Sequence, residues 1–295
     1  MNVTPDLDAP RAAREAGFTD AVTIAFGDPA ADVYGTVRLG LADGHAASGL
    51  VVLFHAGEIA TVVAEGGIPV EDGSSWEHVQ AAGIDTETIE PLRSWRLAFA
   101  GEDASLDLEL EASSPPCALE EKDPVARAGG MLGFEQPVRA RGTVHIGDER
   151  IAIDAVGQRG RSWGSPDWSR IGRTRTVGAW FGDEALAIAA IGAAGGEEHG
   201  REAISATIFE PGDAGCVRVG DPRLSTTFDG DGRQRRAALE LWIDDDGPPR
   251  RATGDVVCGT TLDLGRLRLD TAFLSWRMDD RTGVGRYDIL RLSES

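Results

Sequence analysis

The stretch Val138-Arg139-Ala140-Arg141-Gly142-Thr143-Val144-His145-Ile146 alternates apolar with polar or small residues, and the turn Gly147-Asp148-Glu149 follows it. A second alternating run, residues 150–155, begins directly after this turn. Because successive side chains of a strand point to opposite faces, such alternation is typical of a half-buried β-strand. Two alternating runs joined by a short polar turn predict an antiparallel hairpin.

The same pattern recurs along the whole chain. Further alternating runs with turn residues between them lie at residues 33–39, 95–99, 106–110 and 267–269. Helix signals are confined to residues 9–17 and 74–82, which are too short to connect parallel strands. The sequence therefore predicts an all-β protein with little helix, whose antiparallel strands close into barrels and so hide their edges.

A domain boundary is expected within residues 113–133. Strand periodicity is absent there, and two adjacent prolines, a charged run and a glycine pair occur close together. Each side of this segment holds roughly eight strand candidates, about the number that a small barrel uses. We therefore expect one barrel in residues 1–120 and a second in residues 121–295.

Composition argues against several classes of function. The 295 residues carry 49 acidic and 29 basic side chains, a formal charge of −20 that disfavours binding to nucleic acid or to anionic membrane surfaces. The apolar stretches are far shorter than the roughly 20 residues of a membrane-spanning helix, so no membrane insertion is expected. The first 20 residues resemble no secretory signal. Three cysteines without C-x-x-C spacing suggest neither a disulfide framework nor a zinc site. Together these features favour a cytoplasmic protein.

No cofactor is expected either. The five histidines are scattered without the spacing of metal ligands. The glycine-rich segments lack the lysine and the following helix of a phosphate-binding loop. The sequence therefore predicts no metal and no nucleotide cofactor.

The densest unusual segment, residues 157–170, gathers two tryptophans, three arginines and one aspartate. Large aromatic rings beside charged groups can line a pocket for an apolar ligand and supply a few orienting contacts. We take Asp167, Arg159 and Arg161 as candidate catalytic residues, and we expect Asp167 to pair with an arginine beside an internal cavity. Trp163 and Trp168 are candidate ligand contacts on its wall. The alternative is structural, with the tryptophans closing a barrel end and the arginines paired to acids such as Asp167.

Three landmarks along the chain resemble those of the carotenoid hydratase-like superfamily, which includes hydroxyneurosporene synthase, kievitone hydratase and some Diels–Alderases. They are Glu135-Gln136-Pro137, residues 157–168 and Ser275-Trp276-Arg277-Met278-Asp279-Asp280-Arg281-Thr282-Gly283-Val284-Gly285-Arg286-Tyr287. The resemblance implies two consecutive lipocalin-like barrels and a terpenoid, polyketide or lipid-like ligand. Further candidate ligand contacts are Trp180, Trp276 and Tyr287.

The central motif of many relatives reads approximately G-x-R-D-H-S-W-G-x-R-D-W. Here Gly160 stands in place of its first aspartate, Arg161 in place of its histidine and Pro166 in place of its second arginine. Alkene hydration requires an acid and a base, and arginine cannot act as that base. These departures favour a carrier or sensor of an apolar small molecule. The alternative is a cofactor-independent lyase, hydratase, isomerase or cyclase acting through Asp167, Arg159 and the tryptophans.

Overall fold

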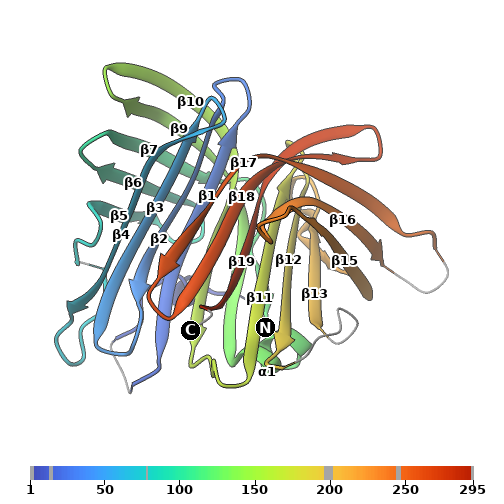
Figure 1. Cartoon of the computed structure of the whole chain (residues 1–295), viewed down its shortest axis with the longest axis horizontal. Helices are drawn as coiled ribbons and strands as arrows, with labels where there is room; N and C mark the ends of the chain where they lie inside the picture. Colours follow the sequence, from blue (N-terminus) through green and yellow to red (C-terminus); the bar gives the residue numbers. More distant parts are fainter. Residues whose placement is uncertain (1–2, 13–15, 78, 196–201, 244–246, 294–295) are drawn as a thin grey trace. The chain divides into compact units, whose positions relative to one another are not determined.

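The computed structural model describes residues 3–12, 16–77, 79–195, 202–243 and 247–293. Two compact units, each built on one antiparallel sheet, make up the chain (Figure 1). The first unit comprises Met1–Glu120 and Gly130–Pro166, and the second comprises Glu121–Gly129 and Asp167–Ser295. Helix is confined, among the described residues, to short pieces. The all-β prediction is confirmed.

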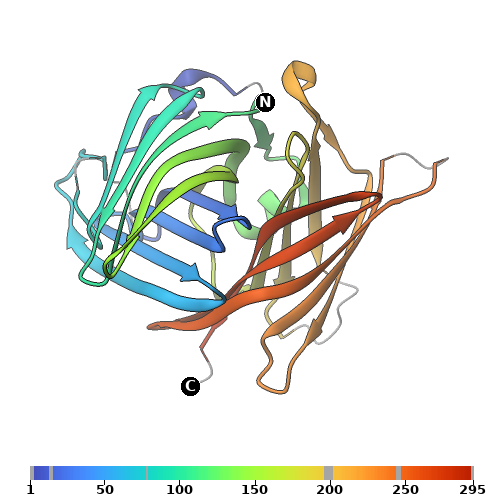
Figure 2. The ribbon, with the colours of Figure 1, turned by 90° about the horizontal axis from the view of Figure 1, so that it is seen from above.

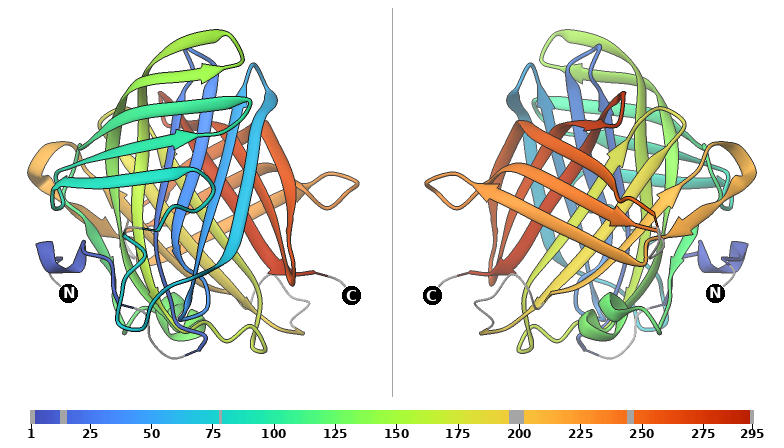
Figure 3. Two further views of the ribbon diagram at one scale, coloured as in Figure 1. Left: turned by 90° about the vertical axis from the view of Figure 1, so that its left-hand side faces the viewer. Right: turned by 90° about the vertical axis from the view of Figure 1, so that its right-hand side faces the viewer.

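The sheet of the first unit has the strand order β4-β3-β2-β1-β10-β9-β7-β6-β5, and β8 also pairs with β9. Its strands curl around a common interior (Figures 2 and 3). The elements of this unit are the 3-10 helix η1 (Pro5–Leu7) and the strands β1 (Thr19–Asp28), β2 (Val33–Leu41), β3 (Ala46–His55), β4 (Glu58–Pro69), β5 (Ile84–Glu90), β6 (Ser94–Ala100), β7 (Ala104–Ala112), β8 (Cys117–Leu119), β9 (Met131–Ile146) and β10 (Glu149–Gly164).

Strand alternation decides which side chains enter the interior of the first unit. In the pairing of β1 with β10, Val22 lies opposite Arg161 and Ile24 opposite Arg159. Val22 and Ile24 belong to the apolar core of this unit. Since directly paired residues share a face of the sheet, the two arginines also point inward. Two charged side chains therefore enter a barrel interior that is otherwise mostly apolar.

The connection between β4 and β5 contributes to the same core. Trp76 and Ala81 of this connection are buried against the apolar cluster of the first unit. The described parts of residues 74–82 and 9–17 form turns and irregular structure, so the helices expected there are wrong. Residues 13–15 and 78 of these two segments lie outside the described residues. A helix this short has little stability of its own, and the tertiary contacts of Trp76 override it.

The second unit has the strand order β14-β13-β12-β11-β19-β18-β17-β16-β15. Its apolar core includes Val177, Leu239, Leu274 and Trp276. The elements of this unit are α1 (Pro124–Gly129), β11 (Ile171–Trp180), β12 (Ala185–Ala193), β13 (Ala203–Phe209), the 3-10 helix η3 (Gly212–Ala214), β14 (Cys216–Arg218), β15 (Asp221–Phe228), β16 (Gln234–Trp242), β17 (Arg250–Leu264), β18 (Leu267–Met278) and β19 (Arg281–Leu292).

The structure corrects the expected domain boundary. Strands β9 and β10, which the prediction assigned to the second barrel of residues 121–295, pair with β7 and β1 and complete the first sheet. Only residues 121–129 of the region before Gly130 belong to the second unit. The boundary segment does lack long strands, but the chain returns to the first sheet after it. This return depends on pairing between strands far apart in sequence, which local composition does not report.

The cysteines also differ from expectation. Cys117 and Cys216 are disulfide-bonded, whereas Cys258 is a buried thiol. The expectation of no disulfide is therefore wrong, and the cytoplasmic location, which rested partly on it, stays a prediction. Among the described residues, no helix combines the length and the apolar character needed to cross a bilayer.

Candidate functional site

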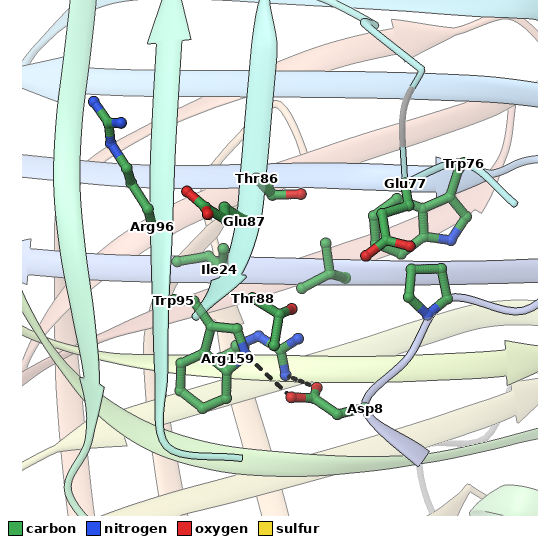
Figure 4. A pocket seen from close by; sticks show the side chains of 12 residues that line it. Asp8, Ile24, Trp76, Glu77, Thr86, Glu87, Thr88, Trp95, Arg96 and Arg159 are labelled. Atoms are coloured by element: carbon green, nitrogen blue, oxygen red, sulfur yellow. Dashed lines mark hydrogen bonds and ion pairs between the residues drawn. The ribbon is translucent and has the colours of Figure 1, made fainter. Parts of the chain in front are cut away.

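A small pocket lies in the interior of the first unit, between β1, β5, β6, β10 and the N-terminal segment (Figure 4). Ile24, Trp76 and Trp95 provide apolar walls, and Asp8 and Arg159 provide charged groups. The space open to the centre of a water molecule is about 20 Å³, enough for one or two waters. The site is therefore nearly filled by its own side chains.

Asp8 and Arg159 form a buried ion pair at this pocket. Arg159 Nη1 lies 2.6 Å from Asp8 Oδ1, and the two side chains are only 4% and 1% exposed, respectively. The other carboxylate oxygen of Asp8 accepts hydrogen bonds from Trp95 Nε1 at 3.0 Å and from the Leu92 amide at 2.9 Å. The Arg159 guanidinium carbon also lies 4.3 Å from the centroid of the Trp95 ring, which favours the cation. Figure 4 shows these three side chains converging.

Asp20 and Arg161 form a second, fully buried pair. Arg161 Nη2 donates to Asp20 Oδ1 at 3.0 Å, and Trp76 Nε1 donates to Asp20 Oδ2 at 2.8 Å. Arg161 Nη2 donates as well to the carbonyl of Ala9 at 3.0 Å. The Arg161 nitrogens Nε and Nη1 are buried and have no hydrogen-bond partner among the described residues. This arginine therefore retains unused donors in a dry environment.

The N-terminal segment, residues 5–12, is part of both pairs. It supplies the Asp8 carboxylate, the Ala9 carbonyl and the Arg11 amide, which donates to Asp20 Oδ2 at 2.8 Å. The Arg11 guanidinium carbon lies 3.5 Å from the centroid of the Trp163 ring. The site is thus built from one wall of the sheet and from a segment that pairs with no strand.

Positive charge exceeds negative charge in the buried part of the site. Three arginines, Arg11, Arg159 and Arg161, face two aspartates, Asp8 and Asp20. Burial lowers the pKa of Arg159 to about 10; the charge of Asp8 opposes this shift and that of Arg161 adds to it. This pKa lies well above neutrality, so the guanidinium is charged at neutral pH.

The rim of the pocket is more exposed and more acidic. Glu77 and Glu87 lie there as exposed side chains, and Arg96 forms a surface pair with Asp107 at 2.7 Å. Exposed carboxylates exchange protons with water, whereas the buried aspartates are held by several donors. The rim therefore offers proton-transfer groups, and the interior offers fixed charge.

Trp163 lies on the inner face of β10, opposite Asp20. It is buried, and it packs edge-on against Phe134, with ring centroids 6.5 Å apart. The prediction placed it on the cavity wall. In the structure it lies beside the Asp20–Arg161 pair and is not among the residues that line the pocket.

Gly160 lies between the two arginines and faces the opposite side of the sheet. A Cβ atom added there would lie 2.5 Å from Oε2 of Glu135. The same Glu135 oxygen accepts a hydrogen bond from Gln158 Nε2 at 2.8 Å. An aspartate at this position, as in the motif described above, would therefore require the Glu135 carboxylate to move and would point away from the pocket.

Asp167 does not take the predicted place. It is an exposed side chain after the end of β10, and its carboxylate accepts hydrogen bonds from the amide and hydroxyl of Ser169, at 3.0 and 2.6 Å. These two bonds lower the pKa of Asp167. The expected pairing with an arginine in a cavity is therefore wrong, because the strand stops at Gly164 and the chain turns outward. Trp168, half-buried, lies with Asp167 in the second unit.

The remaining predicted ligand contacts also lie in the second unit. Trp276 and Tyr287 belong to its apolar core, and the hydroxyl of Tyr287 lies 2.5 Å from Thr226 Oγ1. Trp180 is buried and tilted against Phe273. None of the three lines the pocket of the first unit, and their role as ligand contacts stays a prediction.

Sequence reasoning found the two arginines and missed their partners. Asp8, Asp20, Trp76 and Trp95 drew no functional interpretation. One signal was available, since Asp20 opens the apolar run of β1 and a charge at such a position needs a partner. No group of three or more metal-binding side chains occurs among the described residues.

The comparisons with known proteins bear on the whole chain. The family described as "Domain of unknown function (DUF7064)" matches residues 5–292. The chain belongs to this family. No curated protein matches it in sequence.

Solved structures support the fold of this DUF7064 member. AttH (NE1406) from Nitrosomonas europaea superposes with a TM-score of 0.73 at 12% identity, covering 98% of this chain and 96% of that one. CghA in complex with Sch210972 gives 0.67 at 13%, covering 98% and 96%. Kievitone hydratase from Nectria haematococca gives 0.66 at 13%, covering 98% and 93%. These structures confirm the fold that the resemblance implied, which is the tandem lipocalin-like one.

Proposed function

We propose that this protein is a cofactor-independent enzyme of the lyase (hydratase-like), isomerase or cyclase type, acting on a small, mainly apolar molecule in the first-unit pocket. The observation that carries the proposal is the Asp8–Arg159 pair, buried beside a pocket that Trp76 and Trp95 help to line. A barrel that only had to be stable would be served as well by apolar side chains in these places, because a buried ion pair adds little net stability.

The chemistry that this arrangement favours is stabilisation of a developing negative charge. A fixed guanidinium in a water-poor site stabilises an enolate or another oxyanion far better than solvent does. Elimination or addition of water next to a carbonyl, migration of a double bond and some ring closures all pass through such a species. Glu77 and Glu87, at the rim, are placed to exchange the proton with solvent.

The structural relatives support an enzyme over a carrier. Kievitone hydratase is named for a hydration reaction, and CghA was solved with Sch210972, a small organic molecule, bound. At 12–13% identity the likeness extends to the fold alone, so the reaction of this chain has to come from its own residues.

A carrier of the same molecule is the second candidate. It is favoured by the state of the two buried carboxylates, since Asp8 and Asp20 each accept hydrogen bonds from tryptophan and backbone amide groups besides their arginines. The oxygens of both carboxylates are thus already engaged by protein groups. A carrier would bind the ligand and return it unchanged.

The test is to incubate the protein with a panel of apolar α,β-unsaturated carbonyl compounds in deuterated water and to follow them by chromatography and mass spectrometry. An enzyme of this type gives deuterium exchange, a water adduct or an isomer of altered retention time. Loss of the fixed positive charge in Arg159→Gln should lower the rate by about a hundredfold or more.

Arg150→Gln is the matched control, because Arg150 lies at the exposed start of β10. It should leave the rate unchanged. Binding of panel members without any turnover would favour the carrier. Full activity in the Arg159→Gln variant would show that this pocket is not the site of the reaction.

A further inference from the structure

The carboxylate of Asp8 is held in the way that a protein holds a bound anion. Its partners are the Arg159 guanidinium from β10, which forms an ion pair with it, and two hydrogen-bond donors, the Trp95 indole from β6 and the amide of Leu92, which precedes β6. All three belong to the sheet or its turns, whereas Asp8 belongs to the N-terminal segment. A complete carboxylate-binding site on the barrel is thus filled by a carboxylate from outside the barrel.

The two aspartates of the site differ in this respect. Asp20 lies within β1, with neighbours in β2 and β10, so it cannot leave without breaking the sheet. Asp8 follows the short 3-10 helix Pro5–Leu7 and makes no strand pairing. Of the two carboxylates, only that of Asp8 can be exchanged for another at low cost.

Space leads to the same conclusion. The pocket has room for about one or two water molecules, so a larger molecule can enter only if a present occupant gives way. Asp8 and Pro10 line the pocket and both come from the N-terminal segment. Their withdrawal would join the space that they fill to the existing pocket and expose Arg159 to it.

Charge then selects the ligand. Without Asp8 the site holds Arg159, Arg161 and the partly buried Arg11 against Asp20 and the Glu135 charge near Arg159, and two Arg161 nitrogens already lack a hydrogen-bond partner among the described residues. Such an excess of buried positive charge is unfavourable unless an anion compensates it. The walls around it, Val22, Ile24, Trp76 and Trp95, suit an apolar body.

We propose that the substrate is an apolar molecule with a carboxylate or enolate group, and that this group takes the place of Asp8 on Arg159, Trp95 Nε1 and the Leu92 amide. The proposal rests on the function proposed for this pocket. The exchange of one carboxylate for another keeps the buried charge constant, so no proton has to move. The carboxylate of Asp8 is then an internal stand-in for the ligand.

Chemical rescue tests the anion site without knowledge of the substrate. In Asp8→Ala the empty site should accept acetate, so 100 mM sodium acetate should raise the melting temperature by roughly 2 °C or more over 100 mM sodium chloride. The wild type and the variant Asp154→Ala, which removes an exposed carboxylate, should show no such difference. An Asp8→Ala protein that melts at the same temperature in both salts would overturn the proposal.

Paired probes test the ligand class. 2-Naphthoate and its uncharged isostere 2-naphthamide are titrated against the wild type and Asp8→Asn, which retains the shape of Asp8 in case Asp8→Ala does not fold, with tryptophan fluorescence as the readout. Loss of the competing charge should raise the affinity for 2-naphthoate about tenfold or more and leave that for 2-naphthamide within twofold. Adding Arg159→Gln should abolish the gain.

The possible outcomes separate the two proposals. If both probes bind and neither affinity changes in Asp8→Asn, the anion exchange is wrong while the pocket stands. If neither probe binds any variant, the pocket proposed for the enzyme fails together with the inference.

Discussion

Both units bury arginines among their strands, and the surroundings of Arg175 and Arg159 differ. In the second unit, Arg175 pairs with Glu202 and donates to Thr226 Oγ1 at 3.1 Å and to the Tyr287 hydroxyl at 3.4 Å. In the first unit, Arg159 pairs with an aspartate from the N-terminal segment and faces a tryptophan ring beside a pocket. The second arrangement joins strands to one another and resembles a structural brace. The first holds charge beside a small pocket.

The comparison is tested most strongly by two matched substitutions, Arg159→Met and Arg175→Met. Arg159→Met leaves the buried Asp8 carboxylate without its cation, whereas Arg175→Met leaves the Glu202 carboxylate with Arg173 alone. Arg159→Met should therefore lower the free energy of unfolding by about 3 kcal/mol or more, and Arg175→Met by less. Only Arg159→Met should also abolish binding of 2-naphthoate to the Asp8→Asn protein. Urea denaturation measures the loss of stability, and fluorescence titration measures the loss of binding. Equal loss of binding in both variants would contradict the assignment of a binding role to Arg159 and a structural role to Arg175.

Asp20→Ala is the next largest expected effect. This substitution leaves the buried Arg161 guanidinium without its carboxylate and removes the hydrogen-bond acceptor of Trp76 Nε1. We expect a loss of about 3 kcal/mol in the free energy of unfolding, because an unpaired buried charge remains. A loss below about 1 kcal/mol in urea denaturation would mean that Arg161 finds another partner, and the site would then be more adaptable than its geometry indicates.

Two buried tryptophans offer a smaller contrast. Trp95 Nε1 donates to Asp8 at 3.0 Å, whereas the indole nitrogen of Trp276 in the second unit has no partner among the described residues. Trp95→Phe should therefore cost about 1 kcal/mol more than Trp276→Phe, since only the former breaks a hydrogen bond to a charged group. Thermal unfolding of the two variants in parallel measures the difference. Equal losses would show that the indole bond to Asp8 contributes nothing.

The smallest effect is expected at the rim of the pocket. The hydrogen bond from Arg96 lowers the pKa of Asp107, and both side chains are exposed. In Arg96→Ala the pKa of Asp107 should rise toward its ordinary value, as NMR titration of the carboxyl carbon would show. Because the pKa of Asp107 is lowered in the folded protein, its ionised carboxylate contributes to stability at pH values above its ordinary pKa. That contribution is lost as the pH falls through the lowered pKa. The exposed pair should nevertheless leave stability at neutral pH unchanged, since water screens it.

Strand alternation was sufficient to predict the all-β architecture, because the apolar and polar residues of a half-buried strand alternate within its own short sequence. It could not predict that β10 lies beside β1, since that contact joins residues as far apart as Asp20 and Arg161, 141 positions apart. The boundary error has this cause. A linker-like composition identifies where strands stop, but not to which sheet the chain returns.

The same limit divides the predicted site residues. Arg159 and Arg161 stood out because residues 157–170 gather charged groups beside tryptophans, and the structure places both arginines in the interior. Asp167 was chosen as their partner for its closeness in sequence. The chain turns at the end of β10, however, and the carboxylates that pair with the arginines come from Asp8 and Asp20.

The two neighbouring departures from the motif, Gly160 and Arg161, face opposite sides of β10 and so meet different neighbours. An aspartate at position 160 would have to displace the Glu135 carboxylate, which ends a flexible side chain, whereas a histidine at position 161 would remove the buried guanidinium that pairs with Asp20. The outer face of β10 is therefore the more tolerant of substitution, and the inner face is the more demanding.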